Sequence, residues 1–277
     1  MRWILMVPAG LLILGLLVIP SLGLLLQSLS PSGETGVSLA NFEALYDSRS
    51  ARQAFWRTIE VSLWVTLLSI LAGYPLALAI TRASRGMRAV LLAIIVFPFM
   101  LSAVVRAYGW TVVLGDRGLI NEALVSLGLI DAPIRMMHTS FAIVMGETHL
   151  LMPYMVLSLL AVLRGIDPNL FDAAKSLGAN PASVFWRILM PMTLPGLLTG
   201  TLLVFSLAMT AFATPILLGG TRSPVLTVLL YRYAFTLFDW PKAAAVAAIL
   251  LAMGGAFLIL YRVASRRLLQ GAAGPAP

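Results

Sequence analysis

The sequence contains no cysteine, little charge and almost no histidine. Without cysteine the chain has no disulfides, thiolate nucleophiles or cysteine metal ligands. Its two histidines, His138 and His149, do not stand in an H-E-x-x-H or comparable metal spacing, and the phosphate-loop pattern G-x-x-x-x-G-K-[ST] is also missing. The sequence therefore predicts no metal site, no cofactor and no catalytic residue, and we do not expect the chain to be an enzyme.

The few charges are mostly positive. Nineteen Lys and Arg residues against eleven Asp and Glu residues give a formal net charge of +8. No cluster of these cations is interleaved with aromatic residues in the way a nucleic-acid groove requires, so nucleic acid is not an expected partner. In so apolar a chain, a basic excess is typical of cytoplasmic loops that face anionic lipid.

Long hydrophobic runs make up most of the chain. Hydrophobic residues account for 60% of it and charged residues for 11%, and the mean hydropathy is +0.96. Each of six runs has about the twenty residues that a bilayer crossing needs. The runs are Leu5–Leu26, Ile59–Ile80, Ala89–Leu114, Thr139–Leu163, Gly196–Leu218 and Ala243–Tyr261. The sequence predicts an all-α membrane protein with six transmembrane helices in a lipid bilayer, and both termini on one side.

The connections between these runs are polar or amphipathic. Ser28–Arg57 reads as a loop with a short surface helix over Ala40–Tyr46, and Gly219–Pro241 reads as an outer loop. Leu119–Leu129 is amphipathic, with Asn121 on its polar side, and predicts an interfacial helix.

Basic residues give the expected orientation. With the termini inside, ten Lys and Arg residues lie inside, eight lie outside, and Arg106 lies near the outer boundary, which accounts for all nineteen. The whole count is nearly balanced, but the rule acts through short loops next to spans. The densest such clusters are Arg82, Arg85 and Arg88, and Arg262, Arg266 and Arg267. They place the termini and the segment 167–195 in the cytoplasm.

The segment 167–195 cannot cross a membrane because it carries several charged residues. Asp167 can cap a first helix, and Gly178 supplies a left-handed stop after it. Asn180 and Pro181 repeat the cap-plus-proline start, and we expect a second helix from Pro181 until Pro191 and Pro195 interrupt it. An isolated helix of about ten residues is marginal in water. The apolar stripe of the first helix (Leu170, Phe171, Ala174 and Leu177) therefore predicts a protein partner.

The same segment resembles a family signature. Asp172-Ala173-Ala174, three residues, Gly178, nine residues, Ile188, one residue and Met190-Pro191 look like the EAA motif of ABC importer permeases, E-A-A-x3-G-x9-I-x-L-P, with Asp for Glu and Met for Leu. The resemblance implies that the first helix is a coupling helix that docks on a separate ATP-hydrolysing subunit. It assigns ATPase coupling to Asp172, Ala173, Ala174, Gly178, Ile188 and Pro191.

Two further blocks are similar to permeases of the spermidine/putrescine type. They are PFMLSAVVRAYGWTVVLGDRGLINEAL and the later FATPILLGG. The resemblance implies a type I ABC importer permease fold in a bacterial inner membrane. The partners that it implies are a second homologous permease, a dimer of ATP-binding cassette ATPases and an extracytoplasmic solute-binding protein. It divides the chain into a first helix and outer loop (1–58), a core (59–264) and a cytoplasmic tail (265–277).

Several residues are candidates for the substrate pathway. Glu147 lies inside a predicted span, where a carboxylate is costly and normally faces a cavity or a partner, so it is either a cation contact or a structural hydrogen-bond acceptor. Tyr108 and Trp110 either stack on a cationic substrate or belong to an interfacial aromatic belt. The fifth span is expected to break at Thr214–Pro215, where it either lines a cavity or is merely kinked. The full candidate set is Glu147, Tyr108, Trp110, Tyr154, Phe212, Thr214 and Pro215.

The transported solute stays open at this point. Many polyamine permeases carry an acidic residue before the Phe at the position of Thr210-Ala211-Phe212, and this chain does not. The alternatives are permeases for amino-acid derivatives, phosphonates or iron. An ion-coupled secondary carrier would need buried coupling charges and inverted repeats, of which only Glu147 is a candidate. A non-transporting scaffold would bind no ATPase.

Overall fold

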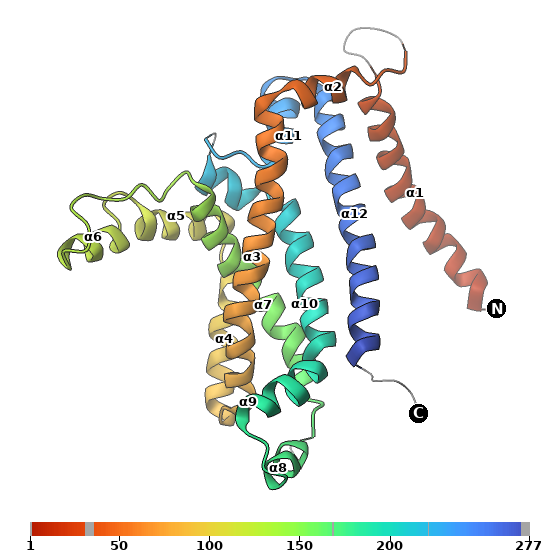
Figure 1. The fold of residues 1–277 in the computed structure, drawn as a ribbon. Coiled ribbons are helices and arrows are strands. Elements are labelled where there is room, and N and C mark those ends of the chain that lie inside the picture. Colours follow the sequence, from red (N-terminus) through yellow and green to blue (C-terminus); the bar gives the residue numbers. More distant parts are fainter. Residues whose placement is uncertain (1, 31–35, 168, 221, 273–277) are drawn as a thin grey trace. The chain divides into compact units, whose positions relative to one another are not determined.

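The computed structural model describes residues 2–30, 36–167, 169–220 and 222–272, and every regular element in those ranges is helical (Figure 1). The α-helices are α1 (Arg2–Ser28), α2 (Ala40–Asp47), α3 (Arg49–Arg82), α4 (Arg85–Met100), α5 (Ala103–Leu114), α6 (Leu119–Ser126), α7 (Ser140–Leu163), α8 (Asn169–Ser176), α9 (Pro181–Val184), α10 (Met190–Thr210), α11 (Leu226–Tyr231) and α12 (Trp240–Ala272). Three π-helical turns join them: η1 (Phe185–Leu189), η2 (Pro215–Gly219) and η3 (Arg232–Thr236). The predicted all-α class is confirmed.

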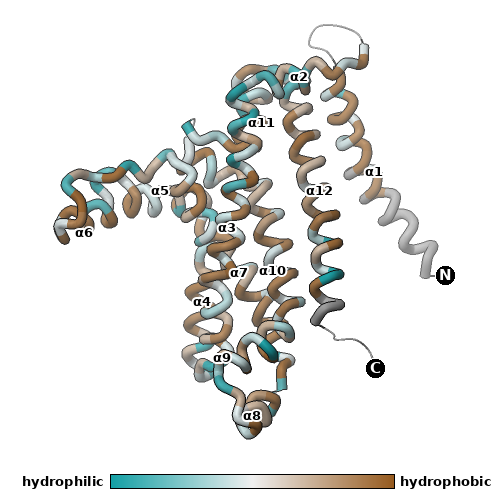
Figure 2. Tube along the Cα trace, viewed as in Figure 1, coloured by the Kyte–Doolittle hydropathy of each residue, from teal (hydrophilic) through white to brown (hydrophobic). Residues whose placement is uncertain are grey.

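Four helices are long and apolar enough to cross a membrane. They are α3, α7, the continuous helix Pro181–Thr210 and α12, and hydrophobic residues dominate along them in Figure 2. The pair formed by α4 with α5 and α6 would make a fifth crossing, although it is bent by 107°. Helix α1 covers the predicted first span. The count of six crossings stays a prediction.

The chain folds into two compact units. One comprises Met1–Arg57 and Pro224–Gly255, and the other comprises Thr58–Ser223 and Ala256–Pro277. In the first unit, α2 and the start of α3 share an apolar core with α11 and α12, built around Leu45, Leu226 and Val246. The division predicted at residues 58 and 264 separates functional regions and not compact units. It therefore stays a prediction.

The second unit contains the predicted core, and helices α7 and α10 pack closely within it. Glycine makes this approach possible. A Cβ on Gly196 would lie 2.8 Å from the carbonyl oxygen of Ser158, and one on Gly200 would lie 2.5 Å from Sδ of Met155. A larger side chain at Gly196 would push the two helices apart because it meets backbone, whereas one at Gly200 would displace the Met155 side chain.

Three predicted boundaries are wrong. The third span, expected to run unbroken over Ala89–Leu114, stops at Met100 and turns through 107°. Ser102 starts the new helix because its side chain accepts a hydrogen bond from the amide of Val105 (3.3 Å). The expected outer loop Gly219–Pro241 contains α11 and η3 instead. The segment Leu226–Tyr231 is apolar, and the burial of Leu226 and Leu229 on one side stabilises it as a helix.

The third error concerns proline. Pro191 and Pro195 do not interrupt the helix that begins at Pro181, which runs on to Thr210. The π turn η1 ends at Leu189, two residues before Pro191, and closes with the amide of Met190 bonded to the carbonyl of Phe185. The wider turn gives the proline ring room that a regular α-turn lacks. The predicted fifth span, Gly196–Leu218, therefore belongs to a longer helix that ends earlier, at Thr210.

Candidate functional site

Helix α8 is capped as the sequence predicts. At its start, Oδ1 of Asp167 accepts a hydrogen bond from the amide of Asn169 (2.9 Å). At its end, Gly178 adopts a φ of +79°, and the amide of Ala179 donates to the carbonyl of Ala174 (3.0 Å). This pattern is a Schellman stop, which needs a residue that tolerates the left-handed region. The two ends of the short helix are thus set by local hydrogen bonds.

The second helix of the segment also starts at the predicted cap. Oδ1 of Asn180 accepts a hydrogen bond from the amide of Ser183 (2.7 Å). The residues of the EAA-like motif then follow through η1 into α10, where Ile188 and Pro191 are half-buried. The motif therefore spans α8, the turn at Gly178, η1 and the first turn of α10.

Helix α8 leaves an apolar face uncovered. Leu170 is 42% exposed and Leu177 is 88% exposed, and Ala173 beside them is exposed as well. Ala174, on the other side of the helix, is buried. A short helix that shows leucine to its surroundings has an incomplete contact surface.

Trp110, Glu147 and Thr214 come together in the second unit, from three different elements. Glu147 on α7 is only 2% exposed; its carboxylate accepts a hydrogen bond from the Thr214 hydroxyl and interacts electrostatically with Arg106. A Cβ on the neighbouring Gly146 would lie 2.8 Å from Cγ2 of Thr214 and 3.7 Å from Cδ1 of Trp110. The contact with Thr214 is the structural alternative that the sequence left open, and a role in the pathway stays a prediction.

The other candidates differ in their exposure and contacts. Tyr108 is 73% exposed, and the ring of Tyr154 packs against Phe99 with 5.1 Å between ring centroids. Phe212 is 37% exposed and Pro215 is buried. Within the described residues, no three His, Cys, Asp or Glu side chains are placed to hold a metal ion.

The break after α10 lies at Ala211–Phe212, not at the predicted Thr214–Pro215. Ala211 is extended, with ψ of 136°, and the next helical bond runs from the amide of Ile216 to the carbonyl of Phe212 (3.0 Å). Pro215 thus stands in the first turn of the new segment, where its missing N–H is not needed. The break precedes the proline because the proline starts a helix.

Arg106 supports the bend between α4 and α5, a role that the sequence did not reveal. Its Nη1 donates hydrogen bonds to the carbonyls of Pro98 (2.9 Å) and Leu101. The carbonyl of Pro98 also accepts a hydrogen bond from the amide of Leu101 (3.3 Å), so Arg106 adds a side-chain donor at the end of the helix, where carbonyls run out of intrahelical partners. The signal in the sequence was an arginine eight residues after a proline inside an apolar run.

Tyr74 links α3 to α10 and was also missed. Its hydroxyl and that of Thr193 are 2.8 Å apart, and one donates to the other. Its ring meets the ring of Phe185 in η1 edge-on, at 5.7 Å between centroids. The π turn η1, which lies within the predicted coupling segment (residues 167–195), is therefore in direct contact with a long apolar helix.

Residues 52–270 match the family described as "Binding-protein-dependent transport system inner membrane component". The spermidine/putrescine transport system permease protein PotB of Haemophilus influenzae is 32% identical over 232 residues, 84% of this chain and 81% of its own length. PotB of Escherichia coli is 35% identical over 211 residues, 76% and 77% of the two chains. The molybdenum transport system permease protein ModB of Mycobacterium tuberculosis is 28% identical over 224 residues, 81% and 83% of the two chains.

Solved transporters share the fold. A chain of the bacterial alginate ABC transporter, crystallised with its alginate pentasaccharide-bound periplasmic protein, superposes with a TM-score of 0.79 at 20% identity, over 97% of this chain and 94% of its own. A chain of the MetNI methionine ABC transporter in an inward-facing conformation gives a TM-score of 0.58 at 17% identity, over 80% and 95% of the two chains. At these identities the likeness concerns the fold alone, and it confirms the predicted permease fold.

Proposed function

Because the chain belongs to the family of inner membrane components of binding-protein-dependent transport systems, we propose that it forms half of the translocation pathway for a small organic cation of the polyamine class. As a permease subunit of an ABC importer it is not catalytic, and a partner ATPase hydrolyses the ATP. The remaining partners under this proposal are a second homologous permease and an extracytoplasmic solute-binding protein. The termini and α8 lie on the cytoplasmic side.

The observation that carries the coupling role is the capped, uncovered helix α8. Its exposed Leu170 and Leu177 provide an apolar face for the ATPase, and its two capped ends make it a rigid contact point. Motion passed to α8 reaches the spans through η1, whose Phe185 ring touches Tyr74 of α3. Closure of the ATPases would thus switch the pathway between outward and inward access.

Co-purification tests this role. A tag on the C-terminal tail should retrieve an ATP-hydrolysing subunit from native membranes, and Leu177→Asp should abolish its retrieval because a charge enters the docking face. Leu129→Asp is the matched control, since Leu129 is also exposed (67%) but belongs to another segment. A tag inserted beside Lys175 should react only from the cytoplasmic side. A pull-down that retrieves no ATPase, or labelling of the tag beside Lys175 from outside the cell, would refute the proposal.

Support for a cationic solute comes from the curated relatives and from the chemistry around Glu147. The relatives at 32% and 35% identity are spermidine/putrescine permeases. Glu147 lies beside the break after α10, and a carboxylate there is a candidate contact for a cation, with Arg106 as a positive charge near it. The ModB relative at 28% identity favours a second candidate, a molybdenum importer.

Uptake separates the two candidates. Cells that carry the complete system should accumulate radiolabelled spermidine or putrescine and not molybdate. In parallel, a thermal-shift screen of the partner binding protein identifies the ligand that stabilises it. Uptake of molybdate alone would transfer the assignment to the second candidate.

Glu147→Gln isolates the charge of Glu147 from its hydrogen bond, because glutamine still accepts the bond from Thr214. We expect a higher KM for cationic substrate with normal insertion of the protein. Thr214→Val is the matched control, since it removes the bond and keeps the carboxylate. Unchanged uptake and affinity in Glu147→Gln would remove Glu147 from the pathway.

A further inference from the structure

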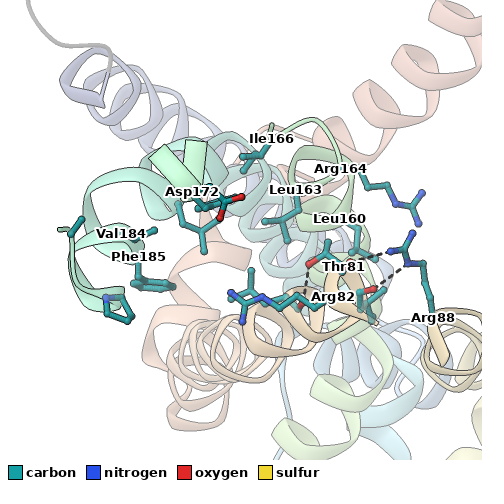
Figure 3. A pocket seen from close by; sticks show the side chains of 16 residues that line it. Thr81, Arg82, Arg88, Leu160, Leu163, Arg164, Ile166, Asp172, Val184 and Phe185 are labelled. Atoms are coloured by element: carbon teal, nitrogen blue, oxygen red, sulfur yellow. Dashed lines mark hydrogen bonds between the residues drawn. The ribbon is translucent and has the colours of Figure 1, made fainter. Parts of the chain in front are cut away.

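A cavity of about 930 Å³ opens beside the coupling segment, within the second unit. The end of α3, the start of α4, the end of α7 and the two helices of the segment all contribute to its lining (Figure 3). The apolar helices α3 and α7 end here, at Arg82 and Leu163, so the cavity lies at the level where apolar spans meet a polar region. Neither the family match nor the coupling role accounts for a cavity at this place.

Three arginines line the cavity: Arg82, Arg88 and Arg164. Figure 3 shows Arg88 and Arg164 on the same side of it. Asp172 is the carboxylate among the lining residues. The lining therefore carries three positive charges against one negative charge.

Arg88 is held in place by the protein. From α4 it reaches back to α3, where its Nε donates to the carbonyl of Ile80 (3.2 Å) and its Nη2 donates to the carbonyl of Thr81 (3.0 Å). Both acceptors are neutral, so the positive charge of Arg88 is oriented without being neutralised. A guanidinium fixed in this way is preorganised for an anion because little side-chain entropy remains to be lost.

The positive charges of the arginines exceed the negative charge placed near them. In the part of the chain that the structure describes, Arg82, Arg88 and Arg164 form no ion pair. Arg82 and Arg164 are exposed and Arg88 is half-buried, so these guanidinium groups are accessible to an anionic ligand. Guanidinium groups match phosphate geometry especially well because they bind it in bidentate fashion.

The rest of the lining is largely apolar. Leu160, Leu163 and Leu189 contribute to it, and Leu189 is buried. A soluble phosphate would gain nothing from these leucines, whereas a lipid places its phosphate on the arginines and its acyl chain along the apolar wall. Basic pockets between transmembrane helices at the cytoplasmic side are suited to anionic lipid headgroups.

We propose that this cavity binds an anionic phospholipid, with its headgroup phosphate on Arg88 and Arg164. Because Phe171 and Asp172 of α8 also line the cavity, the bound lipid bridges the coupling segment to the ends of α3, α4 and α7. A lipid molecule from the membrane therefore helps to hold the coupling segment in place. The proposal is independent of which solute is transported.

Native mass spectrometry of the full chain, in the assembly with which it co-purifies, tests the proposal. We expect the assembly to retain phosphatidylglycerol from mixed nanodiscs and to lose it about tenfold more readily in Arg164→Gln, since one charge-assisted phosphate contact is worth roughly 1.4 kcal/mol or more. Arg164→Lys should retain part of the binding. Arg85→Gln is the matched control, because Arg85 is exposed and adjacent but does not line the cavity.

Three outcomes decide the proposal. Equal lipid retention by Arg164→Gln and the unaltered chain overturns it. Displacement of phosphatidylglycerol by inorganic phosphate also overturns it, because the site would then hold a soluble anion. Selective retention of phosphatidylglycerol over phosphatidylcholine, lost in Arg164→Gln and kept in Arg85→Gln, supports it.

Folding does not confound this test. Arg88→Gln removes two bonds to backbone carbonyls and can unfold the chain, so Arg164→Gln carries the comparison, with its melting temperature in zwitterionic detergent as the check. The readout is bound lipid, whereas the proposed function is tested by ATPase retrieval and uptake. A failure of one is therefore distinguishable from a failure of the other.

Discussion

Replacement of Gly178 by valine should uncouple ATP hydrolysis from uptake. Gly178 ends α8 with a φ of +79°, and a Cβ added there would meet nothing within 4 Å. The substitution therefore causes no clash with a neighbouring residue, and its cost is confined to the backbone conformation. It isolates the geometry of the turn between the two helices of the coupling segment.

The magnitude follows from that conformation. An L-residue in the left-handed region costs about 1–2 kcal/mol, and a β-branched residue lies toward the upper end of the roughly 1–3 kcal/mol typical of strained backbone. A cost of about 2 kcal/mol lowers the population of the native turn roughly 30-fold relative to its alternatives. Helix α8 has eight residues and is too short to persist without its Schellman stop.

Reconstituted transporter provides the assay, with uptake and ATP hydrolysis measured on the same vesicles. We expect uptake by Gly178→Val to fall at least about tenfold, while membrane insertion remains normal and ATP hydrolysis no longer depends on substrate. Gly178→Asn should retain most coupling because asparagine tolerates the left-handed region.

Gly86→Val is the matched control. Gly86 lies in the first turn of α4, where a Cβ would also meet nothing within 4 Å and φ is not positive. Normal coupled transport by Gly178→Val would refute the assignment of the turn as a rigid coupling element. Equal losses in Gly178→Val and Gly86→Val would show that the effect does not come from the left-handed conformation.

Three further substitutions probe the second unit. Gly196→Ala should lower the melting temperature in detergent, because the added methyl group meets a backbone carbonyl of α7 at 2.8 Å and overpacking costs about 1–3 kcal/mol. Tyr74→Phe removes the 2.8 Å hydrogen bond to Thr193 and should cost about 1 kcal/mol in the same measurement. Arg106→Leu leaves the carbonyl of Pro98 without its side-chain donor and should reduce the yield of folded protein, measured by size-exclusion chromatography.

Each of these substitutions has a control elsewhere in the chain. Gly255→Ala adds a methyl group where nothing lies within 4 Å, and Tyr46→Phe alters a residue that is 74% exposed. Arg85→Leu removes an exposed arginine. Melting temperatures or yields that do not differ between a substitution and its control contradict the corresponding contact.

Local chemistry is sufficient to predict the caps and the turn of the coupling segment. Asp167 and Asn180 accept the capping bonds, and Gly178 adopts the left-handed conformation. Each of these features depends on residues within a few positions of each other, so that the sequence specifies both partners of every bond. The surface helix expected over Ala40–Tyr46 is also present, as α2.

The pattern of apolar residues predicted side-chain exposure less reliably where a polar side chain bonds to a distant part of the chain. Asn121, expected on the polar side of an interfacial helix, is only 1% exposed. Its side chain donates to the carbonyls of Gly115 (3.0 Å) and Ile134 (2.9 Å) and accepts from the amide of Ile134 (2.8 Å). The backbone groups that bond to its side chain lie outside the helix, at Gly115 and Ile134. The hydrophobic periodicity of the helix itself carries no information about them.

By itself, the sequence determined that this chain is an all-α membrane protein, where the coupling segment begins and turns, and which family signature it carries. Only the tertiary structure decided that Glu147 meets Thr214, that Arg106 supports the bend after α4, and that Tyr74 joins α3 to α10. Caps and hydropathy are set by neighbours along the chain. Contacts between distant helices depend instead on close packing, and glycines such as Gly196 allow it only once two particular helices lie together.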